Sequence, residues 1–287
     1  MGPIFPLEMS IVQISTEDVL RMANTYLPSP HILIQLGGLL RNTFVDLEEV
    51  TSRLKRDPAL TAQLIRIANS AAYAGREPVA SVEEALTLIG FKDVHRIVGF
   101  ALLEQIGKGS LPVYGISAQR YRENSLLAAL LMEELAVGAN EDPRSCYTMG
   151  LLRSIGKVCL DRLARGHPEH EIPKLKEDLG LADWERCVFG ISSNGVGATI
   201  LKAWRFPDEF VAAISDHYDT QSRHMRLTHL LSLAASMADI LGYGIEGESS
   251  YWLDSAEVYH RAGLEPKEAN VIIDHAFFSF HKLLNNN

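Results

Sequence analysis

The run Leu151-Leu152-Arg153-Ser154-Ile155-Gly156-Lys157 holds the residues with the most chemical information in the chain. Its apolar residues indicate a helical segment that faces the protein interior, where a charged side chain needs a partner. A guanidinium has five donors and no lone pair, so Arg153 can bind an anion but cannot ligate a metal ion. The run therefore predicts either a buried ion pair or a site at which Arg153 and Lys157 hold an anionic ligand.

The candidates for binding an anionic ligand are Arg153, Lys157 and His217. For Arg153, the alternatives are a salt bridge to a nearby acid or simple exposure, because buried arginines are normally paired. For His217, the alternative is a histidine of the core, because its spacing to other histidines is not the i, i+4 spacing of zinc motifs. Thermal protection by phosphate or a nucleotide, abolished by Arg153→Ala, would favour the ligand site.

Motifs for covalent or metal-dependent catalysis do not occur in the sequence. It has no Gly-x-Ser-x-Gly, no phosphate-binding Gly-x-x-x-x-Gly-Lys-Ser/Thr loop and no His-Glu-x-x-His. Cys146, Cys159 and Cys187 match no zinc or redox spacing and are typical of buried thiols in a reducing compartment. We therefore expect no cofactor, no metal site and no catalytic residue.

Helical periodicity dominates the chain, and no run of alternating β-branched residues predicts a strand. Helix start signals occur at Ser15-x-x-Asp18, Asp46, Asp57-Pro58, Ser81-x-x-Glu84 and Asp142-Pro143. These signals and the apolar spacing predict an all-α fold with helices at Val19–Tyr26, His31–Asn42, Leu47–Lys55, Pro58–Asn69, Val82–Ile89, Lys92–Ile106, Ser117–Val137, Asp142–Ala164, Ile172–Leu179, Asp183–Phe189, Gly195–Trp204, Asp208–Tyr218, Leu227–Leu241, Ser255–Ala262 and Glu265–Leu284.

The glycines, serine and proline of Gly107–Gly115 indicate a boundary between two packed helical halves. We expect an N-terminal tail at 1–15, an N-terminal helical half at 16–112, and a second helical half with a C-terminal helix at 113–287. The second glycine-rich stretch, Gly242–Ser250, is predicted to be a flexible loop. Apolar residues of the last helix, Ile272, Ile273, Phe277 and Phe280, would pack on the domain or form a homodimer.

Two ordered sets of residues resemble one known family. The first set is Asp57-Pro58-Ala59-Leu60-Thr61, Leu64, Ile67-Ala68, Asn69-Ser70-Ala71-Ala72-Tyr73, Ser81-Val82, Ala85 and Leu88-Ile89-Gly90. The second is Gly150-Leu151-Leu152, Ile155-Gly156-Lys157, Glu185, Gly190, Val196-Gly197-Ala198, Leu201, Trp204, Pro207 and His217. Together they resemble the HDOD domain, the HD-related output domain of bacterial signalling proteins, over roughly residues 20–220.

The resemblance implies an all-α fold related to the HD phosphohydrolases, in which Leu-Leu-His-Asp-Ile-Gly-Lys carries the metal-binding pair. Arg153 and Ser154 stand at that pair, Asn124 at the first histidine and Ala235 near the distant aspartate. An asparagine could lend one carbonyl oxygen to a hard cation, but alone it makes no metal site. The resemblance therefore implies a degenerate active site at Asn124, Arg153, Ser154 and Ala235.

Asn69, Ser70 and Tyr73 are candidate interface residues. An asparagine at a helix end tolerates the left-handed conformation and bonds locally, which favours a structural joint. The functional alternative is a polar notch between the two halves that recognises a partner.

The chain carries 27 Lys and Arg against 36 Asp and Glu, a net charge of −9, which disfavours general nucleic-acid binding. Its apolar runs are too short to span a membrane and no secretory signal is visible, so we expect a cytoplasmic protein without membrane association. We expect a non-catalytic signalling module that binds a protein partner or a small ligand. The alternatives are a residual metal-dependent phosphodiesterase or nucleotidase, and a receptor that binds a nucleotide or another anion without turnover.

Overall fold

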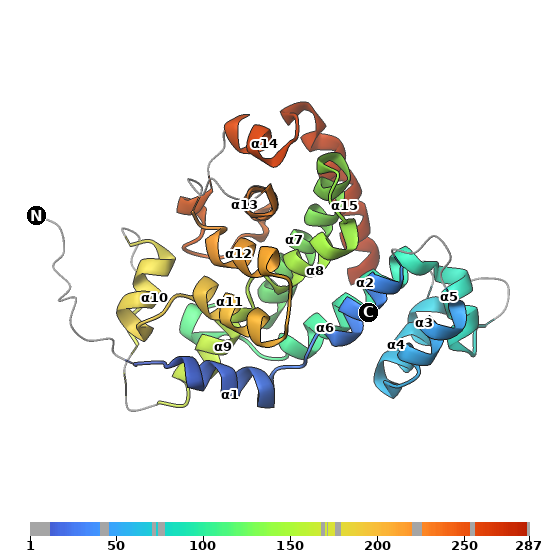
Figure 1. Ribbon diagram of the computed structural model, residues 1–287, viewed down its shortest axis with the longest axis horizontal. Coiled ribbons are helices and arrows are strands. Elements are labelled where there is room, and N and C mark those ends of the chain that lie inside the picture. Colours follow the sequence, from blue (N-terminus) through green and yellow to red (C-terminus); the bar gives the residue numbers. More distant parts are fainter. Residues whose placement is uncertain are drawn as a thin grey trace, which may run out of the picture.

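The computed structural model describes residues 12–40, 46–70, 73, 78–167, 170, 172–175, 179–219, 226–252 and 256–285. These residues form an all-α structure in which no strand is present (Figure 1). The predicted fold class is therefore confirmed. No helix in these ranges is both long and apolar enough to cross a membrane.

Capping side chains fix the starts of the first helices as the sequence predicts. Ser15 and Asp18 form a reciprocal capping box at α1 (Thr16–Tyr26). The Asp46 side chain caps α3 (Leu47–Leu54), and the Asp57 side chain caps α4 (Pro58–Ala68) with proline at the first turn. These caps satisfy backbone N–H groups that a helix start would otherwise leave without a partner.

Short helices form a group at one end of the molecule, on the right of Figure 1. They are α3, α4 and α5 (Val82–Ile89), with α2 (His31–Leu39) beside them. Gly90, with φ of 81°, ends α5 and allows the chain to turn directly into α6 (Phe91–Ile106). Because α6 packs against α2, α4 and α5 on one side and α7 and α8 on the other, it joins the two halves.

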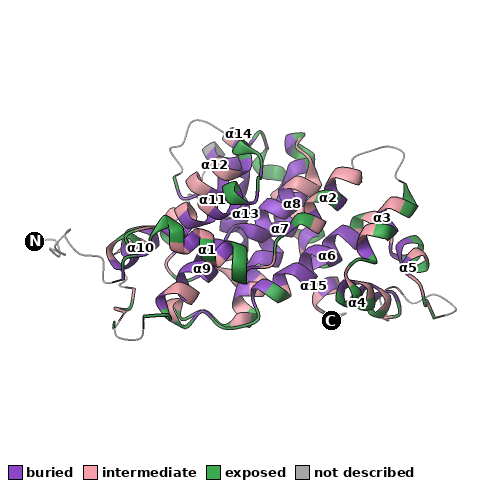
Figure 2. Ribbon diagram, turned by 60° about the horizontal axis from the view of Figure 1, so that its bottom comes forward, coloured by how far each residue is buried: buried purple, intermediate pink, exposed green. Residues whose placement is uncertain are grey.

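The largest helix, α7 (Ala118–Ala139), forms the centre of the second half, and Figure 2 shows it mostly buried. It packs most closely on α8 (Pro143–Leu152), because Gly150 lies against the backbone of Ala128 and Ala129, where a side chain would not fit. α13 (Arg226–Ala238) also packs on α7, and the second half continues with α9 (Ile155–Ala164), α10 (Leu181–Phe189), α11 (Ser193–Ala203) and α12 (Asp208–Asp216).

The first helix does not lie with the other N-terminal helices. α1 packs against α9 and α11, at the bottom of Figure 1. Val12 and Ile14, in the segment expected to be a tail, are buried, and their N–H groups donate to the carbonyls of Val188 and Phe189 at 2.9 and 3.1 Å. The division at residues 15 and 112 stays a prediction, and the structure adds that α1 is held by the second half.

The chain ends in α14 (Ala256–Ala262) and α15 (Ala269–Leu284), which runs beside α7. Phe280 is fully buried, and Ile272, Ile273 and Phe277 are partly buried against the core. These residues therefore pack on the domain, whereas homodimer formation stays a prediction.

Two element predictions are wrong, and a third differs from the structure in helix type. The helix predicted over Asp142–Ala164 is two helices, α8 and α9, separated at Arg153 and Ser154. Of the helix predicted over Ile172–Leu179, residues 172–175 are not helical and residues 176–178 lie outside the described residues; the Pro173 carbonyl accepts the indole N–H of Trp184 at 3.0 Å. The helix predicted over Leu227–Leu241 is helical throughout, as α13 to Ala238 and then as a π-helical turn, Asp239–Tyr243.

Candidate functional site

The junction between α8 and α9 places Arg153 in the interior of the second half. The Arg153 side chain is almost completely buried. Its Nη1 donates to Oε2 of Glu248 at 2.9 Å, and its Nη2 donates to Oδ1 of Asn124 at 2.7 Å. The Asn124 amide nitrogen in turn donates to the Tyr243 carbonyl at 2.8 Å. The structure therefore brings Asn124 and Arg153 into direct contact.

Lys157, one turn later on α9, binds the other side of the same carboxylate. Its Nζ lies 2.7 Å from Oε1 of Glu248 and 2.6 Å from the Tyr218 hydroxyl. The Tyr218 hydroxyl donates to the same Oε1 at 2.7 Å. Asn124, Arg153, Lys157, Tyr218 and Glu248 form what we call the Arg153 cluster. Both cations of this cluster are paired with a single acid.

Burial and charge set the ionisation of the cluster. Burial alone would raise the pKa of Glu248, but Arg153 and Lys157 reverse this and lower it to about 2. Burial, and then the Glu248 carboxylate, raise the pKa of the Tyr218 hydroxyl well above its ordinary value. Glu248 is therefore a carboxylate and Tyr218 a neutral donor at neutral pH.

His217 lies beside the cluster as a neutral core histidine. Its Nδ1 is 2.8 Å from the Ile214 carbonyl oxygen, and its own carbonyl accepts the Ser232 hydroxyl at 2.5 Å. Burial and the neighbouring Arg153 lower its pKa to about 3. Its Nε2 has no hydrogen-bond partner in the described part of the chain. His217 therefore lies in the core, as one of its two interpretations predicts. Its role in anion binding stays a prediction.

The positions implied for the ancestral metal site do not fit a divalent cation. Arg153 is itself a cation there, and Asn124 uses its oxygen to accept from Arg153. Ser154 is buried, and Ala235 lies buried on α13 without a donor atom. Among the described residues, no group of three or more His, Cys, Asp or Glu side chains is arranged to hold a metal ion. We therefore derive no metal-dependent step.

Glu248 is the acid of the Arg153 cluster that the sequence analysis did not predict. The segment Gly242–Ser250 was expected to be a flexible loop, yet Ile245 and Glu248 are buried within it. Burial of Arg153 signals that an acid must pair with it, but nothing in the sequence around Glu248 identifies it as that acid. We call residues 244–252 the Glu248 segment.

Two further acids surround the cluster. Glu185 is fully buried and accepts from the Tyr114 hydroxyl at 3.0 Å and from the Ser193 N–H at 2.6 Å. Asp239 lies one helical turn beyond Ala235, and burial followed by the Glu248 charge raises its pKa. The acid at this end of α13 is therefore Asp239, displaced by one turn from the position that the resemblance implies.

The candidate interface residues have structural partners. The Asn69 side chain donates to the carbonyls of Ile65 and Val79 at 3.0 and 2.8 Å and accepts from the Val79 N–H at 2.7 Å. Its φ of −88° is not left-handed, so Asn69 ends α4 through side-chain hydrogen bonds and not through the expected backbone conformation. Ser70 has a buried hydroxyl that finds no partner in the described ranges.

Tyr73 connects the N-terminal half to α15. Its hydroxyl donates to Oδ2 of Asp93 at 2.7 Å, and Nζ of Lys282 donates to the same oxygen at 2.8 Å. Lys282 also lies 4.0 Å from the centre of the Tyr73 ring. Tyr73 therefore belongs to the joint between the halves, and partner recognition at Asn69, Ser70 and Tyr73 stays a prediction.

A second buried arginine lies at the same joint. Arg96 on α6 binds Glu133 at 2.7 Å, Glu134 at 3.2 Å and Asp93 at 3.4 Å, and donates to the Ser279 hydroxyl of α15 at 3.0 Å. We call these residues, with Tyr73 and Lys282, the Arg96 cluster. Burial, opposed by Arg96, raises the pKa of Glu133.

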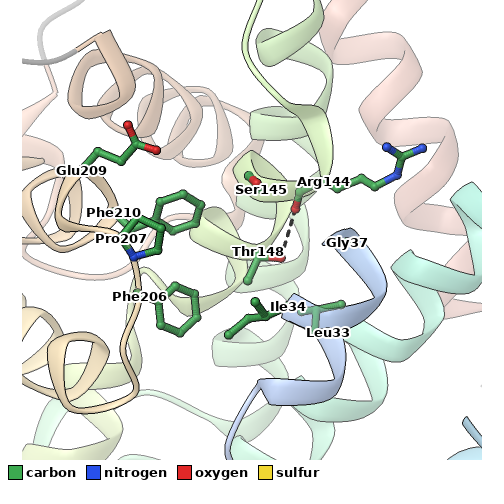
Figure 3. A pocket seen from close by; sticks show the side chains of 10 residues that line it. All are labelled: Leu33, Ile34, Gly37, Arg144, Ser145, Thr148, Phe206, Pro207, Glu209 and Phe210. Carbon is green, nitrogen blue, oxygen red and sulfur yellow. Dashed lines mark hydrogen bonds between the residues drawn. The ribbon is translucent and has the colours of Figure 1, made fainter. Parts of the chain in front are cut away.

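A small cavity between α2, α8 and the start of α12 lies apart from both clusters. Its volume is about 90 Å³, and its apolar lining includes Leu33, Phe206 and Phe210. Figure 3 shows the Arg144 guanidinium pointing away from these phenylalanines. Ligand pockets usually enclose roughly 300–1,000 Å³, so this cavity is too small for a typical ligand.

Comparisons with known proteins agree with this architecture. The family model described as HDOD domain matches residues 27–220. An uncharacterised protein of Treponema pallidum is 21% identical over 77% of this chain, and the match spans 43% of that protein's length.

Solved structures share the fold. An HDOD domain protein of unknown function from Geobacter sulfurreducens is 20% identical, with 94% of this chain and 99% of that chain covered and a TM-score of 0.65. A candidate phosphohydrolase from Shewanella amazonensis is 19% identical, with 94% and 97% covered and a TM-score of 0.64. A candidate signal transduction protein from Marinobacter aquaeolei is 19% identical, with 96% and 61% covered and a TM-score of 0.67.

Proposed function

Because the chain belongs to the HDOD domain family, we propose that it is a non-catalytic regulatory module of a bacterial signalling pathway. It acts by binding a protein partner or a small ligand through its helical surfaces. The observation that carries this proposal is that Arg153, which stands where the resemblance implies a metal-binding pair, is held with Lys157 by Glu248 at 2.9 and 2.7 Å.

The charges of the cluster oppose metal-dependent hydrolysis. A catalytic metal needs several anionic or neutral ligands with free lone pairs and an open position for water. Two fixed cations repel a divalent ion strongly in a buried environment. The only carboxylate in direct contact with them, among the residues that the structure describes, is Glu248, and its charge is already shared by both.

Metal analysis and turnover assays test the proposal together. The full chain, purified without chelator, should contain clearly less than one manganese, iron or zinc ion per molecule. It should not hydrolyse generic phosphodiesters with added Mn²⁺ or Mg²⁺, whereas an HD phosphohydrolase with an intact His-Asp pair serves as the positive control. Stoichiometric metal together with measurable turnover would contradict the proposal.

Partner binding needs a separate experiment. The full chain and a Tyr73→Phe variant are crosslinked in extract of the native cell, and the captured proteins are compared. Tyr73→Phe keeps the ring against Lys282 but removes the hydroxyl that binds Asp93, so it changes the candidate interface with little loss of packing. A partner captured by the full chain and depleted by the variant would support recognition at Asn69, Ser70 and Tyr73.

A further inference from the structure

A pocket of about 280 Å³ lies between four separate segments of the second half. These are the 3-10 helical turn Pro112–Tyr114, the non-helical residues 172–175, α10 and the Glu248 segment. Its lining includes Tyr114, Lys174, Leu175, Leu181, Trp184 and Glu246. Pockets for drug-sized ligands usually enclose roughly 300–1,000 Å³, so this volume suits a smaller molecule.

Hydrogen bonds attach each of the other three walls to α10. Glu185 of this helix accepts from the Tyr114 hydroxyl at 3.0 Å. The Ala182 N–H donates to the Tyr251 hydroxyl of the Glu248 segment at 2.8 Å. Residues 172–175 are held by the α10 indole N–H at 3.0 Å. Because all walls are attached to one helix, the pocket is preformed and ligand binding needs little ordering of the chain.

Apolar side chains form the interior of this pocket. Leu181 and Trp184 are only 1% and 3% exposed, and Leu175 packs against the core. The Tyr114 and Trp184 rings form a T-shaped pair with centres 5.6 Å apart. Aromatic rings at such spacings bind further apolar groups through their faces and edges. The pocket therefore requires a ligand with an apolar body.

Two opposite charges lie at the exposed rim of the pocket. Lys174 and Glu246 are both exposed and belong to different walls. Neither forms an ion pair with a residue that the structure describes. A ligand that is complementary to both carries one anionic and one cationic group beside its apolar body. A free α-amino acid with an apolar side chain is a small molecule that has these three properties.

We propose that this pocket binds a free α-amino acid with an apolar side chain. Lys174 binds its carboxylate, Glu246 binds its ammonium group, and Trp184 packs on its side chain. The inference rests on the proposed non-catalytic binding function and names a ligand class for it. Because Glu246 lies two residues before Glu248, the bound amino acid connects residues 172–175 to the segment that holds the Arg153 cluster together.

Calorimetry on the full chain at about pH 6, where an α-amino group is protonated, tests each property of the ligand. Phenylalanine is the probe, and we expect saturable binding with a Kd below about 1 mM. N-acetylphenylalanine lacks the ammonium group and phenylalanine amide lacks the carboxylate, so each should bind at least about threefold more weakly. Alanine lacks the phenyl ring and should bind at least about tenfold more weakly. Absence of saturable phenylalanine binding, or equal affinity for phenylalanine and either derivative, would overturn the proposal.

Two variants assign the charges of the ligand to the two rim residues. Lys174→Gln should weaken phenylalanine binding at least about threefold but leave phenylalanine amide unaffected, because the amide has no carboxylate to lose. Glu246→Gln should weaken phenylalanine binding to the same extent but leave N-acetylphenylalanine unaffected. Lys202→Gln is the matched control, because Lys202 is exposed on α11 and does not line the pocket. Unchanged phenylalanine affinity in both rim variants, or an equal loss for all three probes, would also overturn the proposal.

Phosphodiester turnover is measured on the same samples. Turnover would contradict the non-catalytic function whatever the amino-acid titrations give, whereas absence of both turnover and phenylalanine binding would overturn only this inference.

Discussion

Arg153 and Arg96 are both buried arginines, but their acids come from different parts of the chain. Arg96 is bound by Asp93 of its own helix and by Glu133 and Glu134 of the adjacent α7. Arg153 depends on one acid, Glu248, which also serves Lys157 and comes from a segment 95 residues away. The first arrangement has three acids, one of them on the same helix, whereas the second depends on a single acid.

The pKa values of the two buried carboxylates shift in opposite directions. Burial raises the pKa of both Glu248 and Glu133, but two direct cations lower the pKa of Glu248 to about 2 while the pKa of Glu133 stays raised. Glu133 contacts Arg96 at 2.7 Å and the exposed Lys92 at 3.7 Å, but it shares both cations with Glu134, which repels its charge. A buried carboxylate is therefore stabilised by the number of cations per acid more than by the presence of an arginine.

The largest expected effect is that of Glu248→Gln. It leaves Arg153 and Lys157 buried without a carboxylate, so the free energy of unfolding should fall by about 3–5 kcal/mol. Denaturant titration measures this change. The matched control is Glu246→Gln, because Glu246 is exposed two residues earlier, and it should stay within about 0.5 kcal/mol of the unmodified chain. A loss below about 1 kcal/mol for Glu248→Gln would mean that the cluster contributes little.

The pH dependence of stability should also differ between Glu248 and Glu133. The folded pKa of Glu248, about 2, lies below its ordinary value of 4.5, so its contribution is present above the ordinary value and is lost as pH falls toward 2. This loss is on the order of 3 kcal/mol, and Glu248→Gln should flatten the acid limb of stability against pH.

Glu133 has the opposite sign. Its folded pKa is raised, so its protonation stabilises the folded state as pH falls through that value, and Glu133→Gln should steepen the acid limb. Acid limbs of the same slope in the two variants would contradict the assigned directions.

At neutral pH, Glu133→Gln should change the free energy of unfolding by less than about 1 kcal/mol. Burial already disfavours the Glu133 charge, and Arg96 keeps Asp93 and Glu134. Denaturant titrations of Glu133→Gln and Glu248→Gln compare the loss of one of three acids around Arg96 with the loss of the single acid beside Arg153. A loss as large as that of Glu248→Gln would show that Asp93 and Glu134 do not compensate.

Local signals predicted most helices because caps and apolar spacing act within one or two turns. Ser15, Asp46 and Asp57 cap helices where the sequence places them. The break at Arg153 and Ser154 escaped prediction because apolar residues continue on both sides of it, so periodicity alone reads one helix. Ile172–Leu179 shows the reverse error, since Ile172 and Leu175 have helical spacing but pack on the core from a non-helical segment.

The site could be predicted only in part. The need of Arg153 for an acid follows from burial, but the identity of that acid requires a contact across 95 residues. Three glycines around Glu248 indicate a loop, and local sequence does not tell a solvated loop from one that carries an acid inward. The resemblance predicts that Asn124 and Arg153 belong to one site. That Tyr218 and Trp252 lie beside them is shown only by the tertiary structure.

The smallest effect concerns Lys282, at the partly exposed end of the Arg96 cluster. Its side chain is 28% exposed, so loss of the Asp93 contact in Lys282→Ala should cost only about 0.5 kcal/mol. Amide hydrogen exchange should nevertheless rise in the last turns of α15, because Lys282 joins that helix to Asp93 and Tyr73. Lys267→Ala, at an exposed position before α15, should leave this exchange unchanged. Exchange in residues 244–252 should also stay unchanged in Lys282→Ala if the two clusters are energetically independent. A rise there would mean that release of α15 is transmitted to the Glu248 segment, and the comparison would then describe one coupled network.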